Sequence, residues 1–378
     1  MGLPELVSIS QFYGSNPDYV IAGGGNTSFK DQDFLYVKGS GISLARAEPG
    51  DFVKMDRAKL GQIWEKTYPA DAGRRESAVL ADMMAAKCPG EEHKRPSVET
   101  LLHDLLPFAY VVHTHPSLVN GLTCSQRGEA ASRELFSGDS LWIPSINPGY
   151  ILCREVKKAA AAFKAACGKT PDIIFLQNHG VFVGADTVDG VKALYKRIIE
   201  TLEKYILRKP DFTPRAAACA VSENLGGELC RLAEKETEGA PWFFRFERNA
   251  EIAGFVKDRR SFAPVSSAFT PDHIVYAGSD PLFIEDPENP EGPAGDWEKH
   301  RGKTGRLPKI TACQGLGIFG LGNSEKTAQT AVELFIDTVK VAVYAESFGG
   351  GRFMDDDQID FINNWEVERY RAQQSGGT

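Results

Sequence analysis

Two histidines separated by one residue have a spacing that suits metal chemistry. His113 and His115 directly follow Phe108–Val112, a β-branched and aromatic run that predicts a buried strand. Side chains two apart in a strand point to the same face, so both imidazoles can reach one ion while Thr114 faces away. This pair would supply part of a metal site, and the remaining ligand must come from elsewhere in the fold.

A third histidine follows another predicted strand. Ile173–Leu176 is apolar and leads to His179, which is followed by Gly180. A catalytic zinc site typically has three protein ligands and leaves a position open for substrate. His-x-His and His-Gly are each common patterns without function, but the chain has only seven histidines. We therefore predict that His113, His115 and His179 hold one divalent metal.

Glu99 is the acidic residue that we expect to act beside this metal. Ser97 and the apolar series after it predict a helix that is capped by Ser97 and ends near Pro107. In one interpretation Glu99 only complements the helix dipole. In the other, its partly desolvated carboxylate takes a proton from a carbon beside a polarised carbonyl and returns it later. His103, on the same helix face, either hydrogen-bonds Glu99 or packs in the core, and we favour packing.

Three short polar segments could bind a phosphate group. Gly23–Ser28 offers turn amides and the Thr27 hydroxyl, Ser40 precedes Gly41, and Ser97 stands at the predicted helix start. The alternative for the first segment is a plain glycine turn in a hairpin. It is neither a P-loop nor a dinucleotide turn, because neither Gly-Lys-Ser/Thr nor a helix follows it.

A glycine motif in the second half raises a different function. Gly315-x-Gly317-x-x-Gly320 matches the dinucleotide-binding fingerprint and makes a nicotinamide dehydrogenase an alternative. In such a turn the helix opens within the glycines. Here two apolar residues intervene, and the next helix is predicted to begin near Asn323. We therefore expect no NAD at this turn.

The elements that position these residues alternate between strands and helices. Tyr19–Ala22 and Phe34–Val37 read as strands of a hairpin whose tip is the glycine turn, and residues 189–207 read as an amphipathic helix. The polar stretch 285–306 is predicted to be an exposed loop. A boundary at 209–214 gives two α/β domains, a metal-binding domain (1–210) and a C-terminal domain (211–378).

The C-terminal domain repeats part of the first domain in sequence. The segment Gln177–Phe182, with the helix after it, is matched about 137 positions later by Gln314–Phe319 and a further helix. In this copy Leu316 takes the place of His179. A weaker echo places Tyr276 where the first histidine of the pair stands. We interpret the C-terminal domain as a degenerate copy without metal.

Composition limits the classes of function. The chain has 378 residues and a formal net charge of −8, and its basic residues form no run, which argues against a nucleic-acid partner. Seven cysteines without a C-x-x-C pair suit a reducing compartment. The N-terminus has no basic, apolar leader, and no run of about eighteen apolar residues is present. We expect a cytoplasmic protein without a membrane partner.

Five motifs in this order resemble the class II aldolase/adducin family. They are Gly24–Ser28, Ser40–Gly41, Pro96-Ser97-x-Glu99, His113-x-His115-Pro116 and Asn178-His179-Gly180. More narrowly, the chain is similar to the aldolase part of bifunctional rhamnulose-1-phosphate aldolase/alcohol dehydrogenases, including the C-terminal segment 364–368. The resemblance implies a three-layer α/β/α fold with a mostly antiparallel central sheet, and assembly as a homo-oligomer.

The resemblance also implies a role for each matching residue. It implies Zn²⁺ or another divalent metal at the three histidines, acid/base work by Glu99, and phosphate contacts from Asn26, Ser40, Gly41 and Ser97. One departure is Val98, where small fuculose-phosphate aldolases have a second serine. This departure removes one expected phosphate donor.

The expected activity is that of a zinc-dependent carbon–carbon lyase. It would cleave a ketose 1-phosphate, such as L-rhamnulose 1-phosphate, into dihydroxyacetone phosphate and an aldehyde. An epimerase or a decarboxylase would use the same enediolate chemistry and is an alternative. A dehydrogenase that uses Gly315–Gly320 and a non-catalytic, adducin-like interaction protein are the others.

Overall fold

The computed structural model contains two compact units and describes residues 2–136, 138–216, 219–289 and 291–365. Residues 366–368 of the C-terminal segment noted above lie outside the described residues. Within the described part, no helix has both the length and the apolar character needed to cross a bilayer.

The first unit runs from the N-terminal helix to Tyr205, apart from Cys124–Gln126, and includes Asn364 and Trp365. Its described residues form a seven-stranded sheet in the order β3-β2-β1-β4-β7-β6-β5. Neighbouring strands are antiparallel, except that β5 and β6 are parallel. The strands are β1 (Asn26–Lys30), β2 (Phe34–Lys38), β3 (Phe52–Asp56), β4 (Tyr110–Thr114), β5 (Ser140–Ile143), β6 (Ile173–Leu176) and β7 (Gly180–Ala185).

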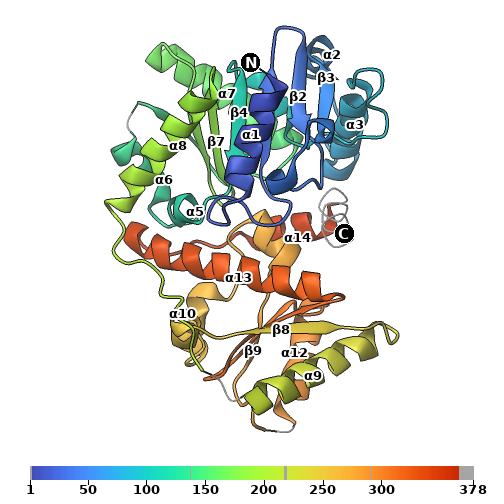
Figure 1. Cartoon of the computed structure of the whole chain (residues 1–378), viewed down its shortest axis with the longest axis vertical. Helices are drawn as coiled ribbons and strands as arrows, with labels where there is room; N and C mark the ends of the chain where they lie inside the picture. The colour runs from blue at the N-terminus through green and yellow to red at the C-terminus, as the bar shows by residue number, and fades with distance from the viewer. Residues whose placement is uncertain (1, 137, 217–218, 290, 366–378) are drawn as a thin grey trace. The chain divides into compact units, whose positions relative to one another are not determined.

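Helices cover both faces of this sheet and make three α/β/α layers (Figure 1). α1 and α8 pack on one face, where the rings of Tyr13 and Tyr195 lie 4.6 Å apart. α2, α3, α4 and α7 complete the core on the other face. The three-layer, mostly antiparallel fold is therefore confirmed. The helices are α1 (Leu3–Gly14), α2 (Arg57–Ile63), α3 (Ala72–Ala85), α4 (Thr100–Leu105), α5 (Ser117–Thr123), α6 (Gly128–Leu135), α7 (Tyr150–Cys167) and α8 (Val188–Glu203).

The predicted N-terminal hairpin was placed wrongly. Tyr19–Ala22 is not a strand, and the glycine turn Gly23–Gly25 leads into β1 instead of joining two strands. The hairpin joins β1 to β2 through Asp31, whose carboxylate accepts the amides of Asp33 at 2.9 Å and Phe34 at 2.8 Å. An aspartate that caps its own turn replaces the predicted glycine tip.

The second unit comprises Cys124–Gln126 and Ile206–Asn363. Its described residues form a four-stranded sheet in the order β8-β11-β10-β9. The strands are β8 (Phe243–Glu247), β9 (Leu282–Ile284), β10 (Ile310–Cys313) and β11 (Gly317–Gly322). The helices are α9 (Cys219–Glu236), α10 (Ala250–Phe255), α11 (Arg259–Phe262), α12 (Gly292–Thr304), α13 (Glu325–Ala345) and α14 (Asp356–Asn364).

Helix α12 replaces most of the exposed loop that was predicted over 285–306. Pro293 stands in its first turn, where a missing amide hydrogen is harmless, and Gly305 ends it in the left-handed conformation. Trp297 is 2% exposed and belongs to the core of the second unit. A single buried tryptophan therefore anchors a helix whose other residues are mostly polar.

The second sheet repeats four strands of the first sheet in the same order. β6 and β7 pair with Ile173 opposite Val183, and β10 and β11 pair with Ile310 opposite Gly320. A parallel strand flanks each pair on one side and an antiparallel strand on the other. A long helix, α8 or α13, follows each pair. The order β8-β11-β10-β9 thus corresponds to β4-β7-β6-β5.

This correspondence corrects one residue match. His113 lies opposite Phe182 in the first sheet, and at the equivalent place in the second sheet Phe246 lies opposite Phe319. Tyr276, which was predicted to replace His113, lies instead in a short π-helix. The apolar and aromatic run around Tyr276 resembles a strand in sequence, but β8 occupies the position of β4.

The other two histidine positions also carry different residues in the second sheet. Arg248 directly follows β8, as His115 directly follows β4. Its Nη1 donates to the carbonyls of Gly315 and Leu316, each at 2.7 Å. Leu316 lies in the β10–β11 turn, as His179 lies in the β6–β7 turn. A guanidinium group, which cannot bind a cation, therefore occupies one ligand position of the copy.

Candidate metal centre

The ends of two strand segments in the first unit bring the three predicted histidines together. His113 is in β4, His115 directly follows it, and His179 lies in the turn that joins β6 to β7. Because β7 pairs with β4, this turn lies beside the end of β4. The Nε2 atoms of His113 and His115 are 3.0 Å apart. Among the described residues, these three form the group with metal-ligand spacing, with ligand atoms within 4.8 Å of one another.

Neighbouring groups orient the histidine pair. Thr114 faces away as predicted, since its hydroxyl donates to Tyr195 Oη at 2.8 Å. Nδ1 of His113 lies 3.0 Å from the carbonyl oxygen of Val181. A hydrogen on Nδ1 that is donated to this carbonyl directs the Nε2 lone pair toward the other histidines, as in many protein metal sites. The His113 ring also stacks on Phe182 at 4.0 Å.

Gly180 allows the turn of His179 to come close to β4. A Cβ atom at position 180 would lie 2.6 Å from the Thr114 carbonyl oxygen and 2.7 Å from Cδ2 of His115. Both distances are far shorter than a carbon contact allows. Any larger residue would push the β6–β7 turn and the histidine pair apart.

Glu99 points one carboxylate oxygen at the histidines. Its Oε1 lies 3.5 Å from Nε2 of His113 and 3.7 Å from Nε2 of His179. This oxygen is buried and has no hydrogen-bond partner among the described residues. The helix predicted to be capped by Ser97 begins instead at Thr100, and the Ser97 Oγ accepts the Glu99 amide at 3.3 Å. The carboxylate therefore faces the histidines and makes no capping bond to α4 within the described part.

This donor set suits a divalent cation. Three imidazole nitrogens are a common ligand set of catalytic zinc, and they leave a position open. A buried carboxylate oxygen without a partner is costly unless a positive charge or a donor reaches it. A cation held by the three imidazoles would compensate the charge of Glu99.

A hydrogen-bond chain that the sequence did not reveal holds the other oxygen of Glu99. Nδ2 of Asn26 donates to Glu99 Oε2 at 2.5 Å, and Oδ1 of Asn26 bonds Nε2 of His103. Nδ1 of His103 lies 2.7 Å from Ser28 Oγ. All four residues are buried. The favoured prediction that His103 only packs was wrong, since its ring is linked to Glu99 through Asn26.

Thr27 is the predicted phosphate contact that the structure turns away. Its Oγ1 lies 2.6 Å from Ser10 Oγ, while its neighbours Asn26 and Ser28 point toward His103. Side chains alternate along a strand, so Thr27 must face the opposite side of β1 from Asn26. The strand beginning at Asn26, which the sequence did not predict, fixes this alternation.

The remaining phosphate candidates lie on adjacent backbone segments. The Ser40 amide donates to the Arg95 carbonyl at 2.8 Å, and the Ser97 amide donates to the Lys38 carbonyl at 3.3 Å. The loop of Ser40 and Gly41 therefore runs beside the segment that carries Ser97. The structure groups these three candidates on the chain that leads into α4.

Lys38 is a buried cation beside this loop that the sequence did not single out. Its Nζ donates to the carbonyls of Gly23, at 3.3 Å, and Ile42, at 2.8 Å, and the residue is 3% exposed. It thus joins the glycine turn to the Ser40–Gly41 loop. A lysine at the end of a strand is ordinarily solvated, so no local pattern indicated this role.

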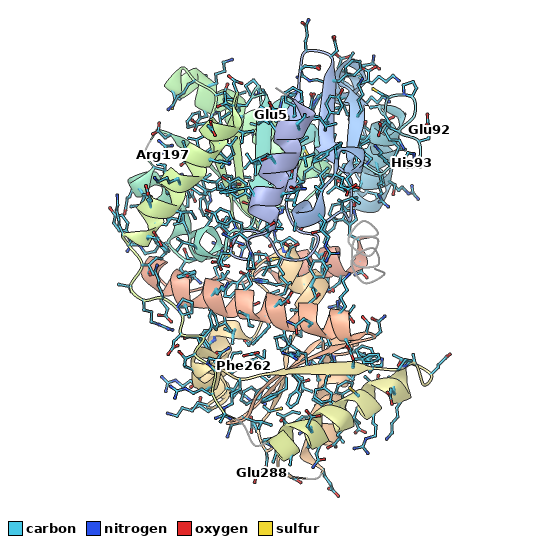
Figure 2. The ribbon with its side chains drawn as sticks, in the orientation of Figure 1. Glu5, Glu92, His93, Arg197, Phe262 and Glu288 are labelled. Atoms are coloured by element: carbon cyan, nitrogen blue, oxygen red, sulfur yellow. The ribbon has the colours of Figure 1, made fainter. Side chains whose placement is uncertain are left out.

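The other histidines do not join this group. His93 is exposed on the surface (Figure 2), and His103 makes the contacts described above. In the second unit, His273 Nε2 bonds Asp337 at 2.9 Å, and His300 borders a separate pocket.

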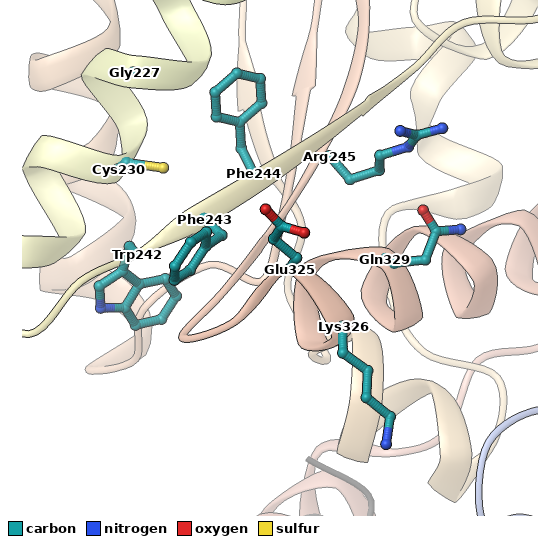
Figure 3. A pocket seen from close by; sticks show the side chains of 9 residues that line it. All are labelled: Gly227, Cys230, Trp242, Phe243, Phe244, Arg245, Glu325, Lys326 and Gln329. Carbon is teal, nitrogen blue, oxygen red and sulfur yellow. The ribbon is translucent and has the colours of Figure 1, made fainter. Parts of the chain in front are cut away.

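A pocket of about 710 Å³ in the second unit has no such chemistry. Figure 3 shows aromatic side chains of the β8 segment on one side and the polar side chains of Glu325 and Gln329 on the other. Cys230 is its nucleophilic group. Burial raises the pKa of this thiol to about 11, so it stays protonated near neutral pH.

The glycine motif of the second unit lies in an antiparallel strand pair. Gly315 is in the turn between β10 and β11, and Gly317 and Gly320 lie within β11. Helix α13 begins at Glu325, after the strand. A Cβ atom on Gly320 would lie 2.5 Å from the Ala328 carbonyl, so this glycine serves the packing of α13 on the sheet. The motif therefore lacks the strand–turn–helix geometry of a dinucleotide site.

Residues 5–206 match the model of a family described as Class II Aldolase and Adducin N-terminal domain. The chain belongs to the class II aldolase and adducin family. The match covers more than half of the chain and contains the histidine cluster, Glu99 and Asn26. The family resemblance inferred from the five motifs is therefore confirmed.

Individual relatives are more distant. A Bacillus subtilis (strain 168) protein described as the uncharacterized oxidoreductase YuxG is 22% identical over 412 residues, which cover 98% of this chain and 58% of that protein. This chain thus spans little more than half the length of that relative. The N-terminal class II aldolase domain of a Thermoplasma acidophilum protein is 27% identical, with a TM-score of 0.46, and the match covers 55% of this chain and 94% of that one. An L-fuculose-1-phosphate aldolase from Thermus thermophilus is 14% identical, with a TM-score of 0.33 and coverage of 53% and 92%.

Proposed function

We propose that this chain is a divalent-metal-dependent aldolase, with Zn²⁺ as the first candidate metal. Its substrate would be a ketose 1-phosphate, such as L-rhamnulose 1-phosphate, and its products dihydroxyacetone phosphate and an aldehyde. The observation that carries the proposal is the buried Oε1 of Glu99, which lacks a hydrogen bond within the described residues and faces His113 and His179. A carboxylate in this position can exchange a proton with a carbon held beside the three histidines.

The roles of the chain's residues follow from this geometry. The three histidines would hold the metal, which when bound would act as a Lewis acid toward the substrate's carbonyl. Cleavage of the carbon–carbon bond leaves a carbon that must gain a proton, and Glu99 Oε1 would deliver it. Asn26 holds Oε2 and thereby keeps Oε1 toward the histidines. In the reverse reaction Glu99 would remove the same proton.

A phosphate group of the substrate would bind at the loop of Ser40 and Gly41 and at Ser97. The backbone segments of these residues are adjacent, and Lys38 places a positive charge beside them. Opposite charge in a low-dielectric environment favours a phosphate there. Asn26 is a less suitable phosphate contact than the family resemblance implied, because its carboxamide is engaged by Glu99 and His103.

The family relationship also permits the alternatives. An epimerase or a decarboxylase would use the same histidines and Glu99, and an adducin-like interaction protein would use neither. A dehydrogenase built on Gly315–Gly320 is disfavoured, because these glycines lie in and beside an antiparallel strand. Assembly as a homo-oligomer and a cytoplasmic location stay predictions.

The test is a substrate panel. Purified chain loaded with Zn²⁺ is incubated with several ketose 1-phosphates, and dihydroxyacetone phosphate is detected by a coupled enzyme. We expect cleavage of at least one substrate, its loss after chelation, and its return with added Zn²⁺. Turnover that survives complete metal removal would contradict the proposal, as would epimer or CO₂ formation without carbon–carbon cleavage between sugar fragments.

A further inference from the structure

The two oxygens of the Glu99 carboxylate have different environments. Oε2 accepts a hydrogen bond from Asn26 at 2.5 Å, whereas Oε1 faces the histidine cluster. The terminal torsion of a glutamate has a broad energy profile, so the side chain alone does not decide which way its oxygens point. Asn26 therefore determines the orientation of the carboxylate.

The orientation of Asn26 is itself determined. A carboxylate only accepts hydrogen bonds, so the nitrogen of the carboxamide must face Glu99 and its oxygen must face His103. Nε2 of His103 must then carry the hydrogen, and Nδ1 accepts from Ser28 Oγ at 2.7 Å. The donors run in one direction, from Ser28 through His103 and Asn26 to Glu99.

His103 has the properties that this chain requires. Its side chain is fully buried, and its ring meets Phe182 edge-on at 5.5 Å. Burial lowers its pKa well below the usual range, with further contributions from His113 and Lys30. A neutral imidazole has one donor and one acceptor nitrogen, which match the two neighbours.

We propose that His103 is a positioning residue for the proposed reaction: its Nε2 hydrogen fixes the carboxamide of Asn26, and Asn26 fixes Glu99 with Oε1 toward the histidine cluster. The inference rests on the proposed function. Without the His103 donor, Asn26 can rotate and the carboxylate loses its fixed orientation. Proton transfer should slow, while substrate affinity and metal content should persist, because His103 is not among the metal-spaced histidines.

Two variants of similar size separate positioning from packing. The His103→Gln substitution would keep an N–H donor near the place of Nε2, and the His103→Leu substitution would fill the space without a donor. We expect His103→Leu to lower kcat about tenfold to a hundredfold, with KM and bound metal nearly unchanged. We expect His103→Gln to retain kcat within about fivefold of the parent. A packing role predicts the reverse order, and a His103→Leu variant as active as His103→Gln would overturn the proposal.

A spectroscopic measurement tests the chain of donors without relying on activity. The chain is labelled with ¹⁵N-histidine, and the His103 signals are assigned by their loss in His103→Gln. We expect a neutral ring with the hydrogen on Nε2 between pH 6 and 8, both with and without Zn²⁺. A hydrogen on Nδ1, or a charged ring, would contradict the inference even if the parent is an active aldolase. If the parent cleaves no ketose phosphate, the proposed function fails, and the tautomer still decides whether His103 orients Asn26.

Discussion

Replacing Glu99 with glutamine separates the two roles considered for this residue. The amide has the shape of the carboxylate, but it cannot carry a proton. Because Asn26 donates to Oε2 of Glu99, the amide oxygen should take that place, and the amide nitrogen should face the histidines. The hydrogen bond to Asn26 is thus preserved, and the group opposite His113 and His179 changes.

The two roles predict effects of different size. Loss of a general acid or base typically costs a factor of about 10²–10⁴ in rate, or about 2.7–5.5 kcal/mol in activation free energy. Loss of a charge that only complements a helix dipole costs about 0.3–1 kcal/mol in stability and leaves turnover nearly unchanged. The structure favours the first role, since the carboxylate of Glu99 makes no capping bond to α4 in the described part.

The assay compares Glu99→Gln with the parent on the best substrate from the panel. Bound metal, thermal midpoint and kcat are measured together, and Glu129→Gln serves as the control. Glu129 is an exposed glutamate near a helix start, paired with Arg133, so its loss reports the helix and charge effects alone. A Glu99→Gln variant that keeps its metal and cleaves within about threefold of the parent would refute the catalytic role. That change is only about 0.65 kcal/mol.

Three further predictions concern the metal site and its surroundings. His179→Ala should reduce bound metal from about one ion per chain to nearly none, measured by atomic absorption, whereas one retained ion would place the metal elsewhere. Gly180→Ala should lower metal content and the free energy of unfolding, the latter by about 1–3 kcal/mol in chemical denaturation, because its Cβ would lie 2.6 Å from a backbone oxygen. Burial lowers the pKa of Lys30 to about 7, so between pH 7 and 10 the unfolded chain binds a proton there that the folded chain does not. Stability should therefore rise with pH across this range, and Lys30→Met should reduce the slope; an unchanged slope would show that Lys30 is not the group responsible.

The histidine cluster could be predicted because the rules that place it are local. Alternation along a strand puts His113 and His115 on one face, and a glycine after His179 permits a close turn. Both rules act over a few residues. The sequence could not show the neighbours of Glu99, because Asn26 and His103 are 77 positions apart and meet only when β1 pairs with β4.

The wrong predictions share a physical cause. Tyr19–Ala22 has a strand-like composition, but the Asn16 carbonyl accepts the amides of Tyr19, at 2.9 Å, and Val20, at 3.1 Å, and bends the chain into a turn. The stretch predicted as a loop over 285–306 is polar along most of its length, yet Trp297 anchors it as a helix. In both cases a single tertiary or turn contact outweighed the average composition of the segment.

The repeated sheet shows why the scaffold alone does not make a second site of the same kind. The site of the first unit needs the strand of His113, the turn of His179, and Asn26 from β1, which pairs with the other side of β4. In the second unit β8 takes the place of β4 but is the edge strand of the sheet in the described residues, so nothing there corresponds to β1. Phe246 and Arg248 have replaced the histidine pair. Restoring three histidines would therefore restore at most the ligands of a metal, because the strand that orients the acid/base residue in the first unit has no equivalent in this sheet.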